Sequence, residues 1–428
     1  MGSIKILRGN FIHAVGLGEL EIYEGAWCVI ENGRIREMLK SLPTALAEAP
    51  VVDTGPGFLI PAFSDIHVHA PHLPYAGVGF DEELIPWLKK YTFPLESRFA
   101  DGKFAETAYR EFIRRLWRDG TLHSCVFATL HRESTALLFD LFRQSGLSAY
   151  IGKVNMDRNG IPGLSETADQ SIEETIELIG SYHRPDGRVR YVLTPRFVPS
   201  TSDRLMRALG DLAEKYRLPV QSHLDENRGE IALVREMYPA YRDYADVYDR
   251  FGLMPKGRTI MAHCVYLSER EIDLLSHKEV MVAHCAQSNA DLASGIMPLR
   301  KYLDRGLRVG IGSDVGGAHV FSMQRHVVET VQASKLRWVG NEAEKPVSVA
   351  ESFSLATRAS GSFFGNTGSF AVGNQFDALV IDDSALECGL PLGLRERLER
   401  FLYTGDDRQI SARYLCGEEI PEPFPKAT

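Results

Sequence analysis

Side chains that could bind a metal ion stand at or near the ends of several apolar segments of the chain. His67 and His69 close the segment "FSDIHVH", and three later segments each end with one further candidate: His223, His263 and Asp314. Residues two apart in an extended strand point to the same side, so His67 and His69 can face one ion. Imidazole and carboxylate groups together suit a borderline divalent metal. An H-x-H pair alone is more often structural, but the alternative of hydrogen-bonded core polar groups would have to hold at every one of these positions.

Glu226 follows His223 by three residues in the segment "HLDE". If the chain turns there, its carboxylate could reach a metal-bound water without itself binding the metal, which is the position that a proton shuttle needs. The alternative is that Asp225 and Glu226 only begin a helix, where carboxylates favour the positive end of the helix dipole. The spacing leaves both alternatives open. We interpret His284, in "VAHCAQSN", as a packed core histidine whose hydrogen bonds are satisfied.

Eight apolar segments rich in β-branched residues alternate with amphipathic segments, and this pattern predicts the elements that position the candidate residues. The strand-like segments cover residues 58–69, 121–131, 148–156, 188–197, 218–224, 259–265, 280–289 and 307–314. The helix-like segments include 104–120, 134–146, 203–217 and 268–278. The alternation is typical of a (β/α)8 TIM barrel, in which the carboxyl ends of the strands share the face where active sites form. A doubly wound sheet is the alternative, but no strand-like segment is followed by a Gly-rich dinucleotide-binding turn.

Both ends of the chain have the pattern of short strands and turns. Asn32-Gly33 separates "WCVI" from "RIREM", a strong hairpin signal because both turn residues must adopt a positive φ. "FDALVIDD" and "ARYLCGEEI" give the C-terminal end the same character, with a turn at Cys416-Gly417-Glu418. We therefore predict an α/β fold in which residues 1–60 and 370–428 form a small composite β-sandwich and residues 61–369 form the catalytic barrel.

The composition restricts the classes of partner. The 428 residues are 44% hydrophobic and 25% charged, as in a soluble globular protein, and the net charge of -9 disfavours nucleic acid or an anionic membrane as a general partner. Six scattered cysteines without a C-x-x-C pair indicate reduced thiols. No stretch reaches the roughly 18 apolar residues of a membrane span. We therefore expect a soluble cytoplasmic protein, although an acidic surface alone says little about small-molecule substrates.

Several motifs, in matching order, resemble those of guanine deaminases in the amidohydrolase superfamily. They extend from about Phe58 to the C-terminus and include "HAPHLPYAGVGFDEELIPWLKKYTFPLESRFAD", "GKVNMDRN", "LTPRFVPS", "QSHLDENRGE", "MAHCVYLS" and "GIGSDVGG". The stretches Tyr91–Pro94 and Thr194–Phe197 are fairly specific to that family. The resemblance implies a hydrolytic deaminase that converts guanine to xanthine and ammonia. It also implies a homodimer, as is common among relatives.

The resemblance further implies a role for each candidate residue. It implies one zinc ion, with iron as the alternative, bound by His67, His69, His223 and Asp314. Glu226 would move the proton, His263 would hydrogen-bond the substrate or the nucleophile, and Asp314 would also orient the hydroxide. Arg196 would hold the purine oxygen, with Phe197 at the same pocket wall; a structural ion pair is the alternative for Arg196. Binuclear relatives need a bridging Lys, commonly at the end of the fourth strand, where this chain has Arg and Phe.

Position 72 departs from the family pattern. Guanine deaminases usually have Gln three residues after the second metal-binding histidine, whereas this chain has His72 there. Imidazole presents its donor and acceptor at fixed ring positions, and mismatched buried polar groups can reduce kcat/KM by orders of magnitude. His72 is therefore a predicted substrate-binding residue, and it leaves related rings open as alternatives: 8-oxoguanine, a pterin or an amino-triazine such as ammeline. A catalytically inactive amidohydrolase-like scaffold is a second alternative, which the retained site residues disfavour.

Overall fold

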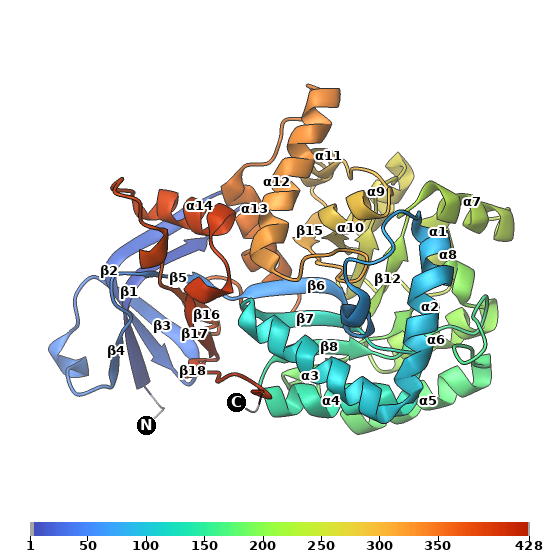
Figure 1. Ribbon diagram of the computed structural model, residues 1–428, viewed down its shortest axis with the longest axis horizontal. Coiled ribbons are helices and arrows are strands. Elements are labelled where there is room, and N and C mark those ends of the chain that lie inside the picture. The colour runs from blue at the N-terminus through green and yellow to red at the C-terminus, as the bar shows by residue number, and fades with distance from the viewer. Residues whose placement is uncertain (1–3, 427–428) are drawn as a thin grey trace.

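Strands from both ends of the chain form one eight-stranded sheet beside the barrel (Figure 1). The structure is a computed structural model and describes residues 4–426. The N-terminal strands are β1 (Ile4–Ala14), β2 (Leu20–Glu31), β3 (Arg34–Leu39), β4 (Val51–Asp53) and β5 (Phe58–Pro61), and the C-terminal strands are β16 (Ala378–Ile381), β17 (Ile410–Leu415) and β18 (Glu418–Glu419). Their order is β18-β17-β16-β5-β1-β2-β3, with β4 paired to β1. Because β5 pairs with β1 on one side and with β16 on the other, the two chain ends meet at β5.

Two tight turns shape this sheet as the sequence predicts. Asn32 and Gly33 join β2 to β3 with φ of 52° and 76°, and Cys416 and Gly417 join β17 to β18 with φ of 50° and 77°. A positive φ at both central residues matches the twist of the two hairpin strands. The predicted hairpin at Asn32-Gly33 and the predicted turn at Cys416-Gly417-Glu418 are therefore confirmed.

One face of the sheet packs on its own buried apolar cluster. The cluster contains Leu7, Phe11, Ala26, Cys28, Ile30, Ile35, Leu59, Phe370, Phe376, Ala378, Val380 and Tyr414. Hydrogen bonds join all eight strands into one sheet, seven of them in one path and β4 paired to β1, so a sheet composed of both chain ends is found, while its arrangement as a sandwich stays a prediction. The predicted domain boundaries, residues 1–60 with 370–428 for the β-domain and residues 61–369 for the barrel, stay a prediction. Residues 1–3 and 427–428 of those ranges lie outside the described residues.

A second set of strands, parallel within each of their sheets, forms the barrel. They are β6 (Phe63–His69), β7 (Thr121–Phe127), β8 (Ser148–Gly152), β9 (Val154–Asn155), β10 (Val189–Tyr191), β11 (Thr194–Pro195), β12 (Val220–Leu224), β13 (Thr259–His263), β14 (Met281–His284) and β15 (Arg308–Ile311). The predicted strand-like segments correspond to these strands. Three of the segments each contain two strands: the first contains β5 and β6, the third contains β8 and β9, and the fourth contains β10 and β11.

The strands follow a barrel order, but their backbone ladders do not close into one sheet. Among residues 4–426 the ladders are β10-β8-β7-β6, β11-β9 and β12-β13-β14-β15. A bridge between Leu193 and Val220 joins the two halves, and the Asp314 N–H donates to the His67 carbonyl at 2.8 Å across the seam between β15 and β6. Because β15 ends at Ile311, residues beyond the strand join this seam in place of a ladder. The predicted order of strands is found, whereas a continuous closed ladder is not.

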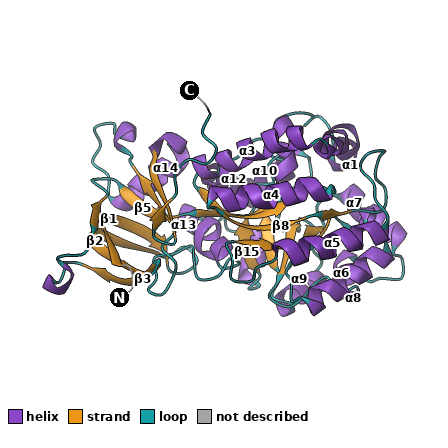
Figure 2. Ribbon diagram, turned by 90° about the horizontal axis from the view of Figure 1, so that it is seen from below, coloured by secondary structure: helices purple, strands orange, loops and turns teal. Residues whose placement is uncertain are grey.

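Helices surround the barrel strands (Figures 1 and 2). The longer ones are α3 (Gly102–Arg118), α4 (Arg132–Ser145), α5 (Ala168–Tyr182), α6 (Asp203–Lys215), α7 (Arg228–Met237), α9 (Glu269–His277), α12 (Met323–Gly340) and α14 (Leu394–Thr404). The predicted helices correspond to α3, α4, α6 and α9. Ser202 caps α6, and Ser268 forms a capping box with Glu271 in α9, which fixes where these helices begin. Within residues 4–426, no helix combines the length and the apolar character that a membrane span requires.

Candidate metal centre and active site

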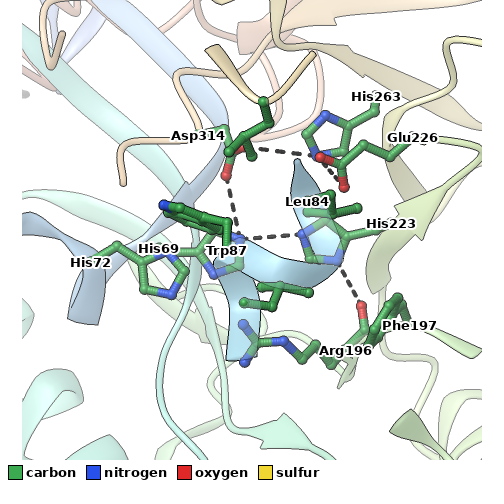
Figure 3. Close-up of a pocket in the computed structure, with 12 residues that line it drawn as sticks. His69, His72, Leu84, Trp87, Arg196, Phe197, His223, Glu226, His263 and Asp314 are labelled. Atoms are coloured by element: carbon green, nitrogen blue, oxygen red, sulfur yellow. Dashed lines mark hydrogen bonds and ion pairs between the residues drawn. The ribbon is translucent and has the colours of Figure 1, made fainter. Parts of the chain in front are cut away.

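A cavity opens at the carboxyl ends of the barrel strands (Figure 3). Its lining residues come from strand ends, from the loops that follow them and from a helical segment over residues 84–88: His69, His72, Leu84, Trp87, Leu88, Arg196, Phe197, His223, Glu226, His263, Leu292 and Asp314. Every predicted site residue except His67 lines this cavity, and His67 is buried beside it. The expected convergence at one face of the barrel is therefore found.

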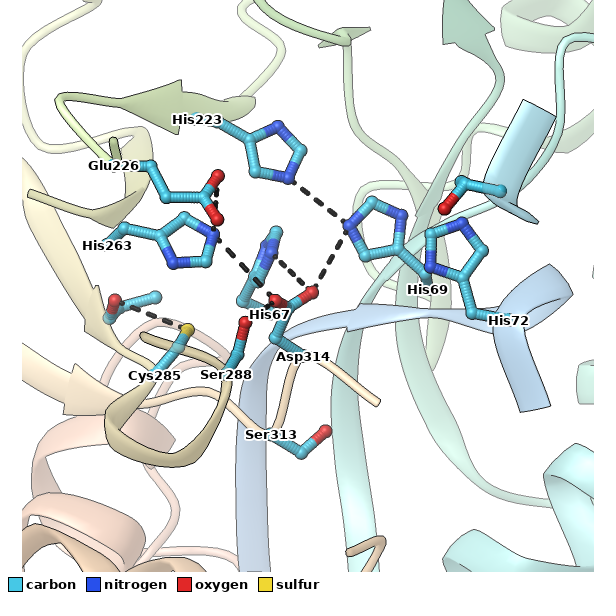
Figure 4. Close-up of polar contacts among 12 residues, drawn as sticks. His67, His69, His72, His223, Glu226, His263, Cys285, Ser288, Ser313 and Asp314 are labelled. Atoms are coloured by element: carbon cyan, nitrogen blue, oxygen red, sulfur yellow. Dashed lines mark hydrogen bonds and ion pairs between the residues drawn. The ribbon is translucent and has the colours of Figure 1, made fainter. Parts of the chain in front are cut away.

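Four side chains bring one candidate ligand atom each to a common point (Figure 4). His69 Nε2 lies 3.2 Å from His223 Nε2 and 3.5 Å from Asp314 Oδ1. His67 Nε2 lies 3.3 Å from the same Asp314 oxygen. A tetrahedral site with metal–nitrogen distances of about 2.0–2.1 Å has edges of about 3.3 Å. The three distances are close to such edges. His67, His69 and Asp314 form one group of residues whose ligand atoms all lie within 4.8 Å of one another, and His67, His223 and His263 form another.

The surroundings leave these nitrogen atoms free to bind a cation. Burial lowers the pKa of His69 and of His223 well below the usual value, so both rings are neutral near pH 7. His223 Nδ1 donates to the Arg196 carbonyl at 2.7 Å, which leaves the Nε2 lone pair toward the centre. His67 Nε2 is enclosed and has no hydrogen-bond partner among the described residues. Three imidazoles and one carboxylate form a donor set that suits zinc or ferrous iron.

Asp314 is oriented by contacts at both of its oxygens. Ser288 Oγ donates to Oδ2, while Oδ1 faces His67 and His69. Burial alone would raise the pKa of this carboxyl group, but His67 and His263 hold it below the usual value. Asp314 is therefore a charged ligand candidate in a fixed orientation.

Glu226 and His263 face each other beside this cluster. His263 Nε2 lies 3.5 Å from Glu226 Oε2 and 3.9 Å from Asp314 Oδ2. His263 Nδ1 donates to Asn289 Oδ1 at 2.8 Å, which fixes the ring and leaves Nε2 without a hydrogen-bond partner in residues 4–426. Burial and the nearby carboxylates of Glu230 and Asp314 raise the pKa of Glu226 well above the usual value, which favours the protonated form of its carboxyl group. A group that can release and recover a proton thus lies next to the candidate ligands.

The start of the following helix separates the two alternatives for Glu226. α7 begins at Arg228 and is capped by Asn227, whose side chain accepts from the Gly229 N–H at 2.8 Å. Glu226 precedes this cap, and its side chain lines the cavity. The chain turns at Asp225, where φ is 49°. Glu226 therefore occupies the position that a proton shuttle needs, although the role itself stays a prediction.

Four of the eleven non-glycine residues with a positive φ among residues 4–426 lie at or next to the strand ends that carry the candidate site. Asp225, His263, Cys264 and Asp314 have φ of 49°, 70°, 50° and 49°. A residue other than glycine adopts this region at a cost of about 1–3 kcal/mol, and such residues cluster at functional sites. The backbone conformation at these four positions is therefore a second observation, separate from the side-chain chemistry, that is consistent with a functional site at this face of the barrel.

Arg196, Phe197 and His72 form another part of the cavity wall. Arg196 Nη1 donates to both oxygens of Glu96, at 3.0 and 2.7 Å, and His72 Nε2 lies 2.6 Å from Glu96 Oε1. Arg196 therefore forms the ion pair that was the alternative to substrate binding, and it also lines the cavity, so the two roles are compatible. His72 Nδ1 is enclosed and has no partner among the described residues. The structure brings these residues together, while their contacts with a substrate stay predictions.

Some partners of the site were not predicted from the sequence. Glu96, Ser288 and Asn289 orient Arg196, Asp314 and His263, and the sequence gives no periodic signal for them. Glu96 follows directly after "YTFPL", within the stretch that carries the family resemblance, which is the signal that could have found it. The prediction for His284 was wrong in one respect. The ring is buried, but neither nitrogen has a hydrogen-bond partner within residues 4–426.

Known proteins are similar to this chain over nearly its whole length. The sequence profile of the Amidohydrolase family matches residues 58–418. The guanine deaminase of Dictyostelium discoideum is 38% identical over 443 residues, covering 97% of this chain and 98% of the relative. The guanine deaminase of Escherichia coli (strain K12) is 32% identical over 441 residues, covering 98% of each chain. The crystal structure of guanine deaminase from C. acetobutylicum, with guanine bound in the active site, superposes with a TM-score of 0.95 at 42% identity, covering 98% of this chain and 100% of that one.

Proposed function

The chain belongs to the amidohydrolase family, and on that premise we propose that it is a hydrolytic deaminase that converts guanine to xanthine and ammonia. One observation carries the proposal. His69, His223 and Asp314 converge beside Glu226 in a cavity of a chain that superposes on a guanine-bound guanine deaminase over 98% of its length. A cluster of candidate metal ligands next to a carboxyl group that can accept and release a proton is what hydrolysis of a ring amidine requires.

We propose that one zinc ion, with iron as the alternative, is held by His67, His69, His223 and Asp314. The support is the 3.2–3.5 Å spacing of their ligand atoms and the enclosed, unpartnered His67 Nε2. When bound, such an ion lowers the pKa of a coordinated water to about 7, which makes a nucleophile available at neutral pH.

The residues of the chain would handle the protons of the reaction. Water adds to the ring carbon that carries the amino group, the bond from that carbon to the amino nitrogen breaks, and ammonia leaves as the carbonyl forms. Glu226, as the carboxylate, would take a proton from the attacking water and pass it to the leaving nitrogen; the second proton of the water would move to the adjacent ring nitrogen as the carbonyl forms. The Nδ1–H of His263 donates a hydrogen bond to Asn289 Oδ1, so Nε2 carries the lone pair and would accept a hydrogen bond. Asp314 would also orient the attacking oxygen, since its Oδ2 lies on the His263 side of the cluster.

Arg196 and Phe197 would bind the ring. A guanidinium is a rigid donor fork that suits a ring carbonyl, and Phe197 adds an aromatic surface to a wall that also contains Leu84 and Trp87. His72 would border the ring at the position where the family usually has Gln. The full-length similarity to guanine deaminases favours guanine over 8-oxoguanine, a pterin or ammeline.

We further propose that the enzyme is a cytoplasmic homodimer. The resemblance to dimeric relatives supports the dimer, and six free cysteines support a reducing compartment. Light scattering of the purified protein tests the dimer, because a monomer at micromolar concentration would contradict it.

An ammonia-release screen over guanine, 8-oxoguanine, a pterin and ammeline tests the reaction and the substrate. We expect guanine to have the highest kcat/KM and the purified protein to hold about one zinc or iron per chain. A different ring that exceeds guanine by orders of magnitude would contradict the substrate. Protein that purifies without metal and stays inactive after metal is added back would favour the scaffold alternative.

A further inference from the structure

Glu96 connects two polar residues of the cavity wall without lining the cavity itself. It ends α2 (Phe93–Glu96), which follows α1 (Leu84–Trp87) and a π-helical turn over Leu88–Thr92. Its side chain is 1% exposed, and the basic side chains of residues 4–426 with a nitrogen within 4.0 Å of its carboxylate are His72 and Arg196. One buried carboxylate therefore joins residues that lie after two different barrel strands.

The ion pair with Glu96 leaves one edge of the Arg196 guanidinium free. Nη1 donates to both Glu96 oxygens, whereas Nε and Nη2 have no hydrogen bond to residues 4–426 and are not enclosed atoms. They are therefore accessible from the cavity that Arg196 lines. The ring of Phe93, from the same short helix as Glu96, lies 5.0 Å from the guanidinium carbon. A guanidinium held at one edge and against one face presents its remaining donors in a fixed direction.

The same carboxylate holds His72 against one of the candidate metal ligands. With Nε2 directed at Glu96, the His72 ring lies parallel to the His69 ring, with 4.3 Å between the centroids and 2° between the planes (Figure 4). Gly316 leaves space for this arrangement, because a Cβ there would lie 2.1 Å from the His72 Cβ. Glu96 thus fixes the side chains of the cavity wall from Arg196 to His72, which lies next to the candidate metal ligand His69.

We propose that Glu96 is a positioning residue for substrate recognition: its ion pair directs the free edge of Arg196 at the carbonyl oxygen of the purine ring. The proposal rests on the proposed function, because it assigns the carbonyl-bearing edge of that substrate to Arg196. Without the carboxylate, the long Arg196 side chain can adopt other rotamers, and its free donors lose their direction. A hydrogen bond to a charged group changes affinity by about tenfold to hundredfold, which sets the size of the expected effect.

Equilibrium binding of two ring compounds to the metal-loaded enzyme tests the proposal. Hypoxanthine carries the ring carbonyl and purine lacks it, so the ratio of their Kd values reports the carbonyl contact. Calorimetry measures both Kd values for the unmodified enzyme, for Glu96→Gln and for Arg196→Met. Glu166→Gln is the matched control, since Glu166 is also buried in an ion pair, with Lys153 at 2.5 Å, but does not line the cavity. Metal content is measured for every variant.

We expect Glu96→Gln to reduce the preference for hypoxanthine over purine, measured as the ratio of their Kd values, by about tenfold or more. The metal content should not change. In turnover of guanine, the increase in KM should be larger than the decrease in kcat. Glu166→Gln should keep the preference within about twofold, and adding Glu96→Gln to Arg196→Met should change it no further. An unchanged preference in Glu96→Gln, or full additivity with Arg196→Met, would overturn the proposal. If Glu96→Gln does not fold, the same ratio of Kd values is measured for Glu96→Asp, because aspartate keeps the negative charge but has a side chain that is one methylene shorter. Since binding needs no turnover, failure of the positioning role is distinguishable from failure of the unmodified enzyme to release ammonia from guanine.

Discussion

Replacing Gly316 with alanine should push His72 out of its place beside Glu96. The glycine has a φ of 110°, and an added Cβ would lie 2.1 Å from the His72 Cβ. Carbon atoms pack at about 3.5–4.0 Å, so the histidine must move by roughly 1.4 Å or more. The contact between His72 Nε2 and Glu96 Oε1 is 2.6 Å long, and a shift of that size breaks it.

Two effects combine in the stability of this variant. A side chain at a positive φ costs about 1–3 kcal/mol, and loss of a hydrogen bond to a charged group costs about 1.5–3 kcal/mol. We therefore expect Gly316→Ala to lower the free energy of unfolding by about 2.5–6 kcal/mol. Gly365→Ala is a matched control, because Gly365 has a φ of 120° and an added Cβ there meets no atom of residues 4–426 within 4 Å, apart from its chain neighbours. Only the backbone effect applies to the control.

Urea unfolding of both metal-loaded variants measures the difference in stability, and kcat/KM for guanine measures the effect on the site. We expect kcat/KM to fall in Gly316→Ala and to stay near the unmodified value in Gly365→Ala. Equal losses of unfolding free energy in the two variants would refute the claim that His72 needs the space left by Gly316. So would an unchanged kcat/KM in Gly316→Ala.

Three further predictions concern residues around the cavity. Glu226→Gln should keep its metal, because Glu226 is not a predicted ligand, and should lose about 10²–10⁴ in kcat; a steady-state rate near that of the unmodified enzyme would remove Glu226 from the mechanism. Asn289→Ala should let the His263 ring rotate and lower kcat/KM for guanine by about tenfold to hundredfold, whereas unchanged kinetics would show that Asn289 does not fix the ring. Although burial would raise the pKa of Glu96, Arg196 holds it at about 2, below the ordinary 4.5, so Glu96 stabilises the fold fully above pH 4.5 and loses this contribution as the pH falls toward 2. Urea unfolding at several pH values should show a stability gap between the unmodified protein and Glu96→Gln that narrows in acid, and a gap independent of pH would contradict the assignment.

The positions of the candidate ligands could be predicted because they depend on local pattern and on one rule of topology. His67 and His69 share a side of their strand because side chains alternate with a period of two. His223, His263 and Asp314 meet them because parallel barrel strands end at the same face. These five side chains are the ones that the structure brings together.

The partners of these residues could not be predicted from residue spacing or strand order, because they depend on contacts between distant segments. Glu96 reaches His72 and Arg196 from 24 and 100 residues away in the sequence. Its direction is set by a helical segment that changes from α-helix to a π-helical turn and back, and no hydrophobic period encodes that change. The open seam of the barrel depends in the same way on tertiary context, because it follows from β15 ending at Ile311.

The pairing of β5 with β16 also constrains the order in which the protein can assemble during synthesis. Ala378, which pairs with Pro61, leaves the ribosome 317 residues later. Until then one edge of β5 has no partner, although all of its residues are buried in the finished fold and it leads directly into β6, the strand that carries His67 and His69. Pairings of such long range form slowly and leave strand edges exposed to aggregation. The pairing that anchors the strand carrying His67 and His69 is therefore completed only after Ala378 has been made, so chaperone protection of the nascent chain should raise the yield of folded protein.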